Sequence, residues 1–190
     1  MINNLPYIVY ILYKAKTYNS MAKVEKLVPF ILQWEGGFVN DPYDLGGATN
    51  KGVTIATYDS YRKSIGKPGG VENLKKISTE DWTAIMKNLY WDRWKADTIE
   101  SQSVANVLVD WVWASGVHGI KRPQRLLKVA ADGLVGKNTI NAVNAAEPRQ
   151  FFNDLIADRI KFVDEICKAR PANERFRRGW LNRINSFKYE

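Results

Sequence analysis

The chain has 190 residues, and its 28 Lys and Arg against 20 Asp and Glu give a formal net charge of +8. This length suits one domain with, at most, a small appended element. Because 45% of the residues are hydrophobic and 12% aromatic, the chain can build a packed core, which argues against disorder, a collagen-like repeat and a coiled coil. We therefore expect a compact globular protein.

The single cysteine, Cys167, and the single histidine, His118, limit the available chemistry. A lone cysteine cannot form an internal disulfide, and this pair cannot supply a zinc site with several Cys or His ligands. A Cys–His nucleophilic pair remains an alternative, but Cys167 lies at helical spacing among apolar residues, which is typical of a buried, inert thiol. We expect no metal and no cofactor, so any catalysis would fall to carboxylates.

The first 20 residues differ from the rest of the chain. An apolar, tyrosine-rich run from Leu5 to Tyr13 is followed by Lys14 and Lys16. A secretory signal carries its charge before the apolar run, and this run is too short to span a bilayer. We expect residues 1–20 to be a disordered or non-native extension, with synthesis in the cytoplasm without a recognisable signal peptide and no stable membrane insertion.

The hydrophobic spacing predicts a mostly α chain. A helix from about Val24, interrupted by Pro29 and stopped by a Gly-Gly pair, would place Glu35 on its last turn. Residues 38–54 are dense in Gly, Asn, Asp and Pro, which predicts turns and a small β-hairpin or tongue.

Capping residues mark the next two helices. Thr54 is expected to cap a helix that runs to about Ile65, and Ser78 to cap one that runs to Tyr90 or Trp91.

The most apolar segment predicts a central helix from about Ser103 to Ser115, ended by Gly116. Asp110 lies in the middle of this helix, so we expect it to be buried and paired, for instance with an arginine. Four further helices are expected near 122–130, near 137–145, from Pro148 onward, and near 174–186.

The chemically informative segment begins at Glu35. Its carboxyl group would be partly desolvated between Trp34 and Phe38, and desolvation raises the pKa of a carboxyl group toward the value a general acid needs. Gly36 and Gly37 carry no side chains, so a bulky polymer could approach closely. Glycoside hydrolysis uses such an acid together with a second group across the cleft.

A simpler interpretation is also open, and residue types alone favour it. The Gly-Gly pair would end a helix, Glu35 would be solvated, and the aspartates that follow would cap turns, where carboxylates are common.

Aromatic residues and basic charge each allow more than one interpretation. Trp82, Trp111 and Trp180 fit apolar helix faces and are expected in the core, whereas Trp34, Trp91, Trp94 and Tyr43 border turns and suit either the core or a cleft. The basic C-terminal segment could line a phosphate track, attract an acidic cell wall, or be a solvated face. No nucleic-acid motif accompanies the charge, so we expect no nucleic-acid partner.

Seven blocks in order carry a resemblance to glycoside hydrolase family 108, and it covers about residues 22–187. The blocks are EGGF (35–38), NDP (40–42), DLGGATNKGVT (44–54), YWDRW (90–94), DWVWASG (110–116), DGLVGKNT (132–139) and RGWLNR (178–183).

The resemblance implies a lysozyme-like, mostly helical fold that cleaves the β-1,4 bond between N-acetylmuramic acid and N-acetylglucosamine in peptidoglycan. Some members are labelled secretion activator proteins, and the export route would be similar to that of prophage lytic enzymes such as endolysins, which act on the periplasmic cell wall. We expect peptidoglycan as the partner and a monomeric protein.

The resemblance also implies roles for individual residues. Glu35 falls on the catalytic acid, and Phe38 replaces the usual Tyr. Asp44 with Thr49 would stabilise the developing charge or place the attacking water, and Asp41 competes with Asp44 for the role of second carboxylate. The residues expected to bind substrate are Gly36, Gly37, Phe38, Asp41, Tyr43 and Trp91.

The resemblance divides the chain at residue 116. Residues 21–116 would form the lysozyme-like catalytic part, and residues 117–190 a helical, peptidoglycan-binding-like subdomain packed on it. Gln124 lies where such repeats tend to have Gln. Ala114 stands where the resemblance leads us to expect Asn.

Overall fold

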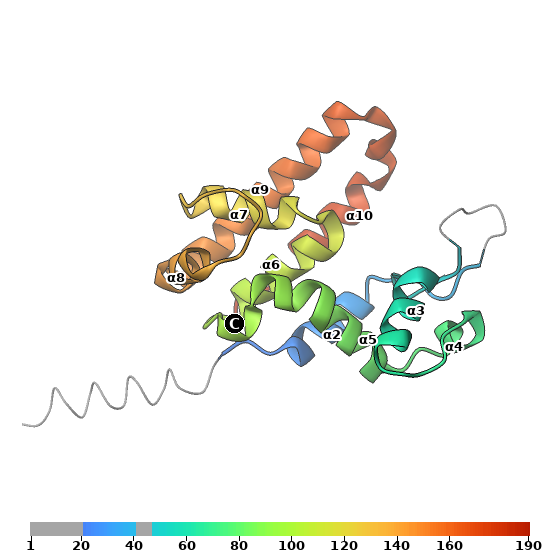
Figure 1. Cartoon of the computed structure of the whole chain (residues 1–190). Helices are drawn as coiled ribbons and strands as arrows, with labels where there is room; N and C mark the ends of the chain where they lie inside the picture. The colour runs from blue at the N-terminus through green and yellow to red at the C-terminus, as the bar shows by residue number, and fades with distance from the viewer. Residues whose placement is uncertain (1–20, 41–46) are drawn as a thin grey trace, which may run out of the picture. The chain divides into compact units, whose positions relative to one another are not determined.

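The computed structural model describes residues 21–40 and 47–190, and this part of the chain is mostly α with one two-stranded sheet (Figure 1). The predicted mostly α, lysozyme-like fold class is confirmed. The contacts group the chain into two compact units, one of Val24–Trp91 and one that contains Asp92–Glu190. The division predicted at residue 116 lies within the second unit and stays a prediction. The predicted extension, residues 1–20, lies outside the described residues.

The first unit opens with α2 (Val24–Leu32), which buries Leu27 and Ile31 on one face and contains Pro29 without ending there. The helix ends at Leu32, so the prediction that Glu35 lies on its last turn was wrong. One further backbone bond, from the Trp34 N–H to the Ile31 carbonyl at 2.9 Å, continues the turn, and Glu35 follows in a bend.

A β-hairpin follows, as predicted. Strands β1 (Thr49–Asn50) and β2 (Val53–Thr54) pair antiparallel, with Thr49 opposite Thr54. The two turn residues, Lys51 and Gly52, have φ values of 49° and 75°. Positive φ at both central residues defines the tight turn whose twist matches that of paired strands, and glycine adopts it without steric cost.

The predicted caps of the next helices are confirmed. The Thr54 hydroxyl accepts the Thr57 N–H at 3.3 Å, and the Ser78 hydroxyl accepts the Asp81 N–H at 3.1 Å. A short helix between them was not predicted, because a five-residue segment carries too few apolar positions to show a period. These elements are α3 (Ile55–Ser64), α4 (Val71–Lys75), α5 (Thr79–Met86) and a π-helical extension of α5, η1 (Lys87–Trp91).

The second unit is built around α6 (Gln102–Ser115), which is apolar on most of its surface and is capped by Ser101. Gly116, at a φ of 56°, ends the helix as predicted. Around it lie η2 (Asp92–Trp94), η3 (Ala96–Thr98), α7 (His118–Leu126), α8 (Lys137–Ala145), α9 (Pro148–Ala169), η4 (Pro171–Asn173) and α10 (Glu174–Asn185).

Helices α9 and α10 form a helical hairpin through η4, and α6 packs against α9 (Figure 1). Cys167 lies buried in this hairpin, in a cluster with Val163 and Ile184, and burial raises the pKa of its thiol. The interpretation of Cys167 as a buried thiol is therefore confirmed. Among the described residues, no helix is both long and apolar enough to cross a membrane.

The carboxylate of Asp110 connects three helices of this unit. Its side chain is 0% exposed on α6 and accepts hydrogen bonds from Arg159 of α9 at 2.9 Å and Arg183 of α10 at 2.6 Å. The prediction of a buried Asp110 paired with an arginine is confirmed, and a second arginine joins the pair. Two guanidinium groups and one carboxylate taken from water are tolerated because each finds an opposite charge nearby.

Replacing Asp110 with Asn should lower the free energy of unfolding by about 3–5 kcal/mol, because it removes the counter-charge of the buried Arg159 guanidinium. Urea unfolding followed by circular dichroism measures the change. Asp164→Asn is the matched control, because that carboxylate pairs with Arg177 on the surface, where both side chains are at least 38% exposed. The control should cost less than about 1 kcal/mol. Equal losses in the two variants would contradict the structural role of Asp110.

Candidate active site

Glu35 lies in the bend after α2, partly buried, and is followed by two exposed glycines. A Cβ atom placed on Gly36 or Gly37 would have no heavy atom of the described residues within 4 Å, apart from its neighbours along the chain. The space over this backbone is therefore open. A polymer could approach the chain beside Glu35 without meeting a side chain.

Backbone hydrogen bonds connect the segment after Glu35 to the β-hairpin. The Lys51 N–H donates to the Gly36 carbonyl at 3.1 Å, and Val39 and Thr49 exchange two hydrogen bonds of 2.8 Å each. Thr49 is fourteen positions from Glu35 in the sequence, and these bonds place both residues on one small element. The segment that follows Glu35 thus lies beside the strand of Thr49, and the catalytic roles of the two residues stay predictions.

Two side chains anchor the hairpin to the helices of the same unit. The Asn50 amide, 5% exposed, donates to the Leu74 carbonyl at 2.9 Å and the Lys75 carbonyl at 3.1 Å, at the end of α4. The Trp82 indole N–H donates to the Lys51 carbonyl at 2.9 Å. Sequence reasoning missed Asn50, whose only signal was an amide between Thr49 and a turn.

The aromatic residues of this unit separate into exposed and buried positions. Trp34 is 36% exposed, and Phe38 is partly exposed with the Lys75 ammonium 5.6 Å from its ring centroid. Trp91 and Trp82 are both 0% exposed, and Trp82 was predicted in the core. The expected substrate contact at Trp91 does not fit the structure, because a ring with no exposed surface offers no face to a sugar.

The remaining predicted site residues, Asp41, Tyr43 and Asp44, lie outside the described residues. The choice between Asp44 and Asp41 as second carboxylate therefore stays open.

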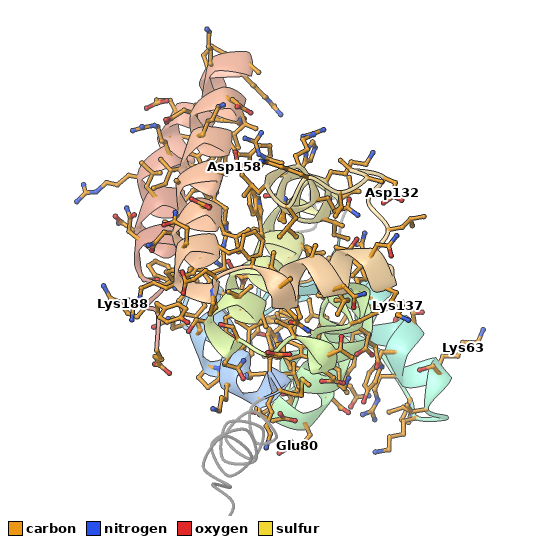
Figure 2. The ribbon with its side chains drawn as sticks, turned by 90° about the vertical axis from the view of Figure 1, so that its left-hand side faces the viewer. Lys63, Glu80, Asp132, Lys137, Asp158 and Lys188 are labelled. Atoms are coloured by element: carbon orange, nitrogen blue, oxygen red, sulfur yellow. The ribbon has the colours of Figure 1, made fainter. Side chains whose placement is uncertain are left out.

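A second ordered element lies in the loop before α8. The Gln124 amide, 0% exposed, donates to Asp132 and to the Leu134 carbonyl at 3.0 Å each, and its oxygen accepts the Gly133 N–H at 2.9 Å. Figure 2 marks Asp132 and Lys137, at the two ends of this loop. Hydrogen bonds from the Leu134 N–H and Gln124 lower the pKa of the Asp132 carboxyl. The buried Gln124 amide thus holds the loop of the DGLVGKNT block (132–139) in place.

The basic residues near the C-terminus do not form a uniform positive surface. Arg183 turns inward to Asp110, Arg177 pairs with Asp164 at 2.7 Å, and Arg175 lies 4.5 Å from the ring centroid of the adjacent phenylalanine. This arrangement weakens the interpretation of the segment as a phosphate track.

Residues 28–116 match the family described as "Glycosyl hydrolase 108", and residues 118–185 match the family described as "Predicted Peptidoglycan domain". Among solved structures, "Structure of Brucella abortus SagA" is similar, with a TM-score of 0.67 and 28% sequence identity over 85% of this chain and 89% of that chain. The comparison with curated proteins finds no match.

These findings support the resemblance: residues 28–116 match glycoside hydrolase family 108, and residues 118–185 match a peptidoglycan domain. They support a glycoside hydrolase that acts on peptidoglycan, with peptidoglycan as its partner. The Glu35 bend and the hairpin both lie within the part that matches the hydrolase family.

Asn50→Ala should loosen the hairpin without unfolding the protein, because it removes both hydrogen bonds to the end of α4. Leaving buried carbonyls unsatisfied costs about 1–3 kcal/mol, so the amide protons of Thr49 and Lys51 should exchange roughly 10 to 100 times faster. Hydrogen–deuterium exchange measures this change. Asn88→Ala, at an exposed position of η1, is the control and should leave both rates unchanged. Unchanged exchange in Asn50→Ala would show that Asn50 does not hold the hairpin.

Proposed function

We propose that the protein is an N-acetylmuramidase, which hydrolyses the β-1,4 bond between N-acetylmuramic acid and N-acetylglucosamine in peptidoglycan. The observation that carries the proposal is Glu35 beside two exposed glycines, hydrogen-bonded through Gly36 to the hairpin of Thr49, within the hydrolase-matching part of the chain. This arrangement gives a carboxyl group an open approach for a glycan strand.

Glu35 would act as the general acid. It would donate its proton to the glycosidic oxygen as the bond to the anomeric carbon breaks, so that the sugar leaves as a neutral alcohol. The positive charge that develops on the other sugar requires a second group. In the proposal Asp44 stabilises this charge or activates a water, with Asp41 as the competing candidate.

Thr49 would position the attacking water. It lies on β1, and two backbone hydrogen bonds with Val39, on the side of β1 away from β2, fix the strand that carries its hydroxyl. A hydroxyl can donate to one partner and accept from another, so it can hold a water in a defined orientation without taking its proton.

The surface next to Glu35 would bind the glycan strand. Gly36 and Gly37 leave the backbone accessible, and Trp34 and Phe38 offer partly exposed rings on either side of Glu35 in the sequence. Trp34 therefore takes the place of Trp91 among the aromatic candidates for sugar contact.

The C-terminal part would hold the enzyme on its polymeric substrate. It matches the predicted peptidoglycan domain, and the net charge of +8 favours a polyanionic wall over neutral surfaces. We propose that the protein acts as a monomer on the periplasmic cell wall.

Glu35→Gln should lower the rate of peptidoglycan lysis by about 100-fold or more, because a positioned general acid contributes about 10²–10⁴ to the rate. Turbidity of purified peptidoglycan measures lysis, and co-sedimentation measures binding, which the substitution should preserve. Glu25→Gln, an exposed change in the first turn of α2, is the control and should lyse at the wild-type rate.

Two outcomes would contradict the proposal. Lysis by Glu35→Gln at the wild-type rate would remove Glu35 from the mechanism. Binding without lysis by the wild-type protein would favour a peptidoglycan-binding accessory protein, and Phe38→Tyr, which restores the hydroxyl usual in the family, would then be the variant to assay.

Thr49→Val should lower kcat by up to about tenfold at nearly constant KM, because the lost hydrogen bond to the attacking water is worth about 0.5–1.5 kcal/mol. Initial rates on peptidoglycan fragments over a range of concentrations separate the two parameters. Thr79→Val, at the exposed start of α5, should match the wild type. A rise in KM with unchanged kcat would instead assign Thr49 to substrate binding.

A further inference from the structure

A hollow opens on the first unit between α3 and the end of α5, two helices that are hydrogen-bonded to each other (Figure 1). The Tyr61 hydroxyl and the Arg62 guanidinium of α3 donate to the Asp81 carboxylate of α5 at 3.3 and 2.7 Å. The hollow has a volume of about 470 Å³, within the range of about 300–1,000 Å³ that is usual for small-molecule sites. The residues that line it are Ala56, Thr57, Ser60, Tyr61, Ser64, Ile85, Asn88 and Leu89.

Helix α3 presents a row of hydroxyl groups to this hollow. The hydroxyl-bearing residues follow one another at i, i+3, i+4 and i+7, which places them on one face of the helix: Thr57, Ser60, Tyr61 and Ser64. The buried residue of α3, Tyr58, lies beside this face. The row therefore lines the hollow, while Tyr58 connects the helix to the core.

Hydrogen bonds within the helix leave these hydroxyls able to bind a ligand. The Thr54 hydroxyl donates to the Thr57 hydroxyl oxygen at 3.0 Å, so the Thr57 proton can reach another acceptor. The Ser64 hydroxyl donates to the Tyr61 carbonyl at 2.7 Å, so its oxygen can accept. Burial and the neighbouring Asp81 raise the pKa of Tyr61, whose hydroxyl stays protonated and holds the ring in place.

The opposite wall comes from the π-helical turn η1. Such turns are rare and occur frequently at functional sites. This one carries Asn88 and Leu89 into the lining, and Leu89 is 43% exposed although it is a large apolar residue. An exposed leucine next to an amide offers an apolar contact and a hydrogen-bonding group side by side.

The lining is neutral. Among the described residues that line the hollow, none is charged, although 25% of the residues in the chain are. A charged ligand would lose hydration there without gaining a counter-charge. Hydroxyls, one amide and an apolar patch instead suit a neutral ligand that carries hydroxyl groups, an amide and a methyl group. An N-acetylated sugar has all of these.

We propose that this hollow is a second, non-catalytic sugar site, which binds an N-acetylglucosamine residue of a glycan strand. The acetamido group lies against Asn88 and Leu89, and the sugar hydroxyls bond to the row on α3. N-acetylmuramic acid fits less well, because its lactyl group carries a carboxylate or a peptide. The choice of peptidoglycan as the source of the strand rests on the proposed function, whereas the sugar chemistry rests on the lining.

Titration of ¹⁵N-labelled protein with short sugar chains tests the proposal. The probes are N,N′,N″-triacetylchitotriose and cellotriose, which has a hydroxyl in place of each acetamido group. We expect triacetylchitotriose to shift the amide signals of Ser60 and Asn88 saturably, and cellotriose to bind at least tenfold more weakly. The methyl glycosides of N-acetylglucosamine and N-acetylmuramic acid identify the preferred sugar, and we expect the first to bind more tightly.

Variants separate this hollow from the proposed active site. Ala56→Phe fills the hollow from an exposed position and should abolish the shifts at Ser60 and Asn88, but leave any shift at Gly36. Ala157→Phe, the same change at an exposed position of α9 outside the lining, should bind as the wild type does. Asn88→Leu keeps the size of the side chain, removes its amide, and should weaken binding roughly 2- to 10-fold. Thermal unfolding verifies that each variant is folded.

Three results would overturn the proposal: equal binding of triacetylchitotriose and cellotriose, unchanged shifts at Ser60 and Asn88 in folded Ala56→Phe, or no saturable shift below about 10 mM. Tighter binding of the N-acetylmuramic acid glycoside would overturn the choice of sugar. Glu35→Gln should bind triacetylchitotriose at Ser60 and Asn88 like the wild type. Loss of lysis in that variant and loss of binding in Ala56→Phe are therefore separate results, and either proposal can fail without the other.

Discussion

The carboxylate of Asp110 is the constraint on which the second unit depends. It sits on the most apolar helix of the chain, fully removed from solvent, and binds a guanidinium group from each of two other helices. A buried ion pair of this kind adds little net stability compared with apolar packing. Removing one partner nevertheless lowers the stability strongly, because the other charge stays buried. It therefore fixes how α6, α9 and α10 face one another. The Arg159 guanidinium carbon also lies 5.5 Å from the Trp111 ring centroid and 5.6 Å from the Phe187 ring centroid.

The proposed active site is held in place by backbone hydrogen bonds and not by a buried ion pair. Its segment has few apolar side chains, and backbone hydrogen bonds position it: Lys51 to Gly36, and the pair between Val39 and Thr49. The buried Asn50 then fastens the hairpin to α4. Hydrogen bonds can thus hold a glycine-rich segment in place with few apolar side chains. The exposed backbone beside Glu35 stays free for a polymer, which bulky side chains would obstruct.

Much of this organisation could be predicted from the sequence, because strong local rules govern it. Thr54 and Ser78 are capping residues, Gly116 ends a helix, and Pro148 occupies the first position of α9 as predicted. Asp110 within an apolar helix requires a buried partner. Local rules could not predict α4, which is too short to show a period, nor the end of α2 at Leu32, where the turn continues without a helix.

Which aromatic side chains are buried depends on tertiary packing, so the sequence alone could not predict it. Trp91 and Trp34 both border turns, yet one is fully buried and the other is exposed. The hydrogen-bond acceptors of Asn50 lie at the end of α4, far from it in the sequence, so its anchoring role could not be predicted. The two residues proposed as the second carboxylate, Asp41 and Asp44, lie outside the described residues, so the family resemblance remains the basis for that proposal.

The most direct test of the central claim is the identity of the new sugar end. Purified peptidoglycan digested in H₂¹⁸O and then reduced with borohydride can be analysed by mass spectrometry. We expect one ¹⁸O at the former anomeric carbon of reduced N-acetylmuramic acid, because a muramidase breaks that bond with water. Reduced N-acetylglucosamine ends, or anhydro ends that contain no ¹⁸O, would contradict the account.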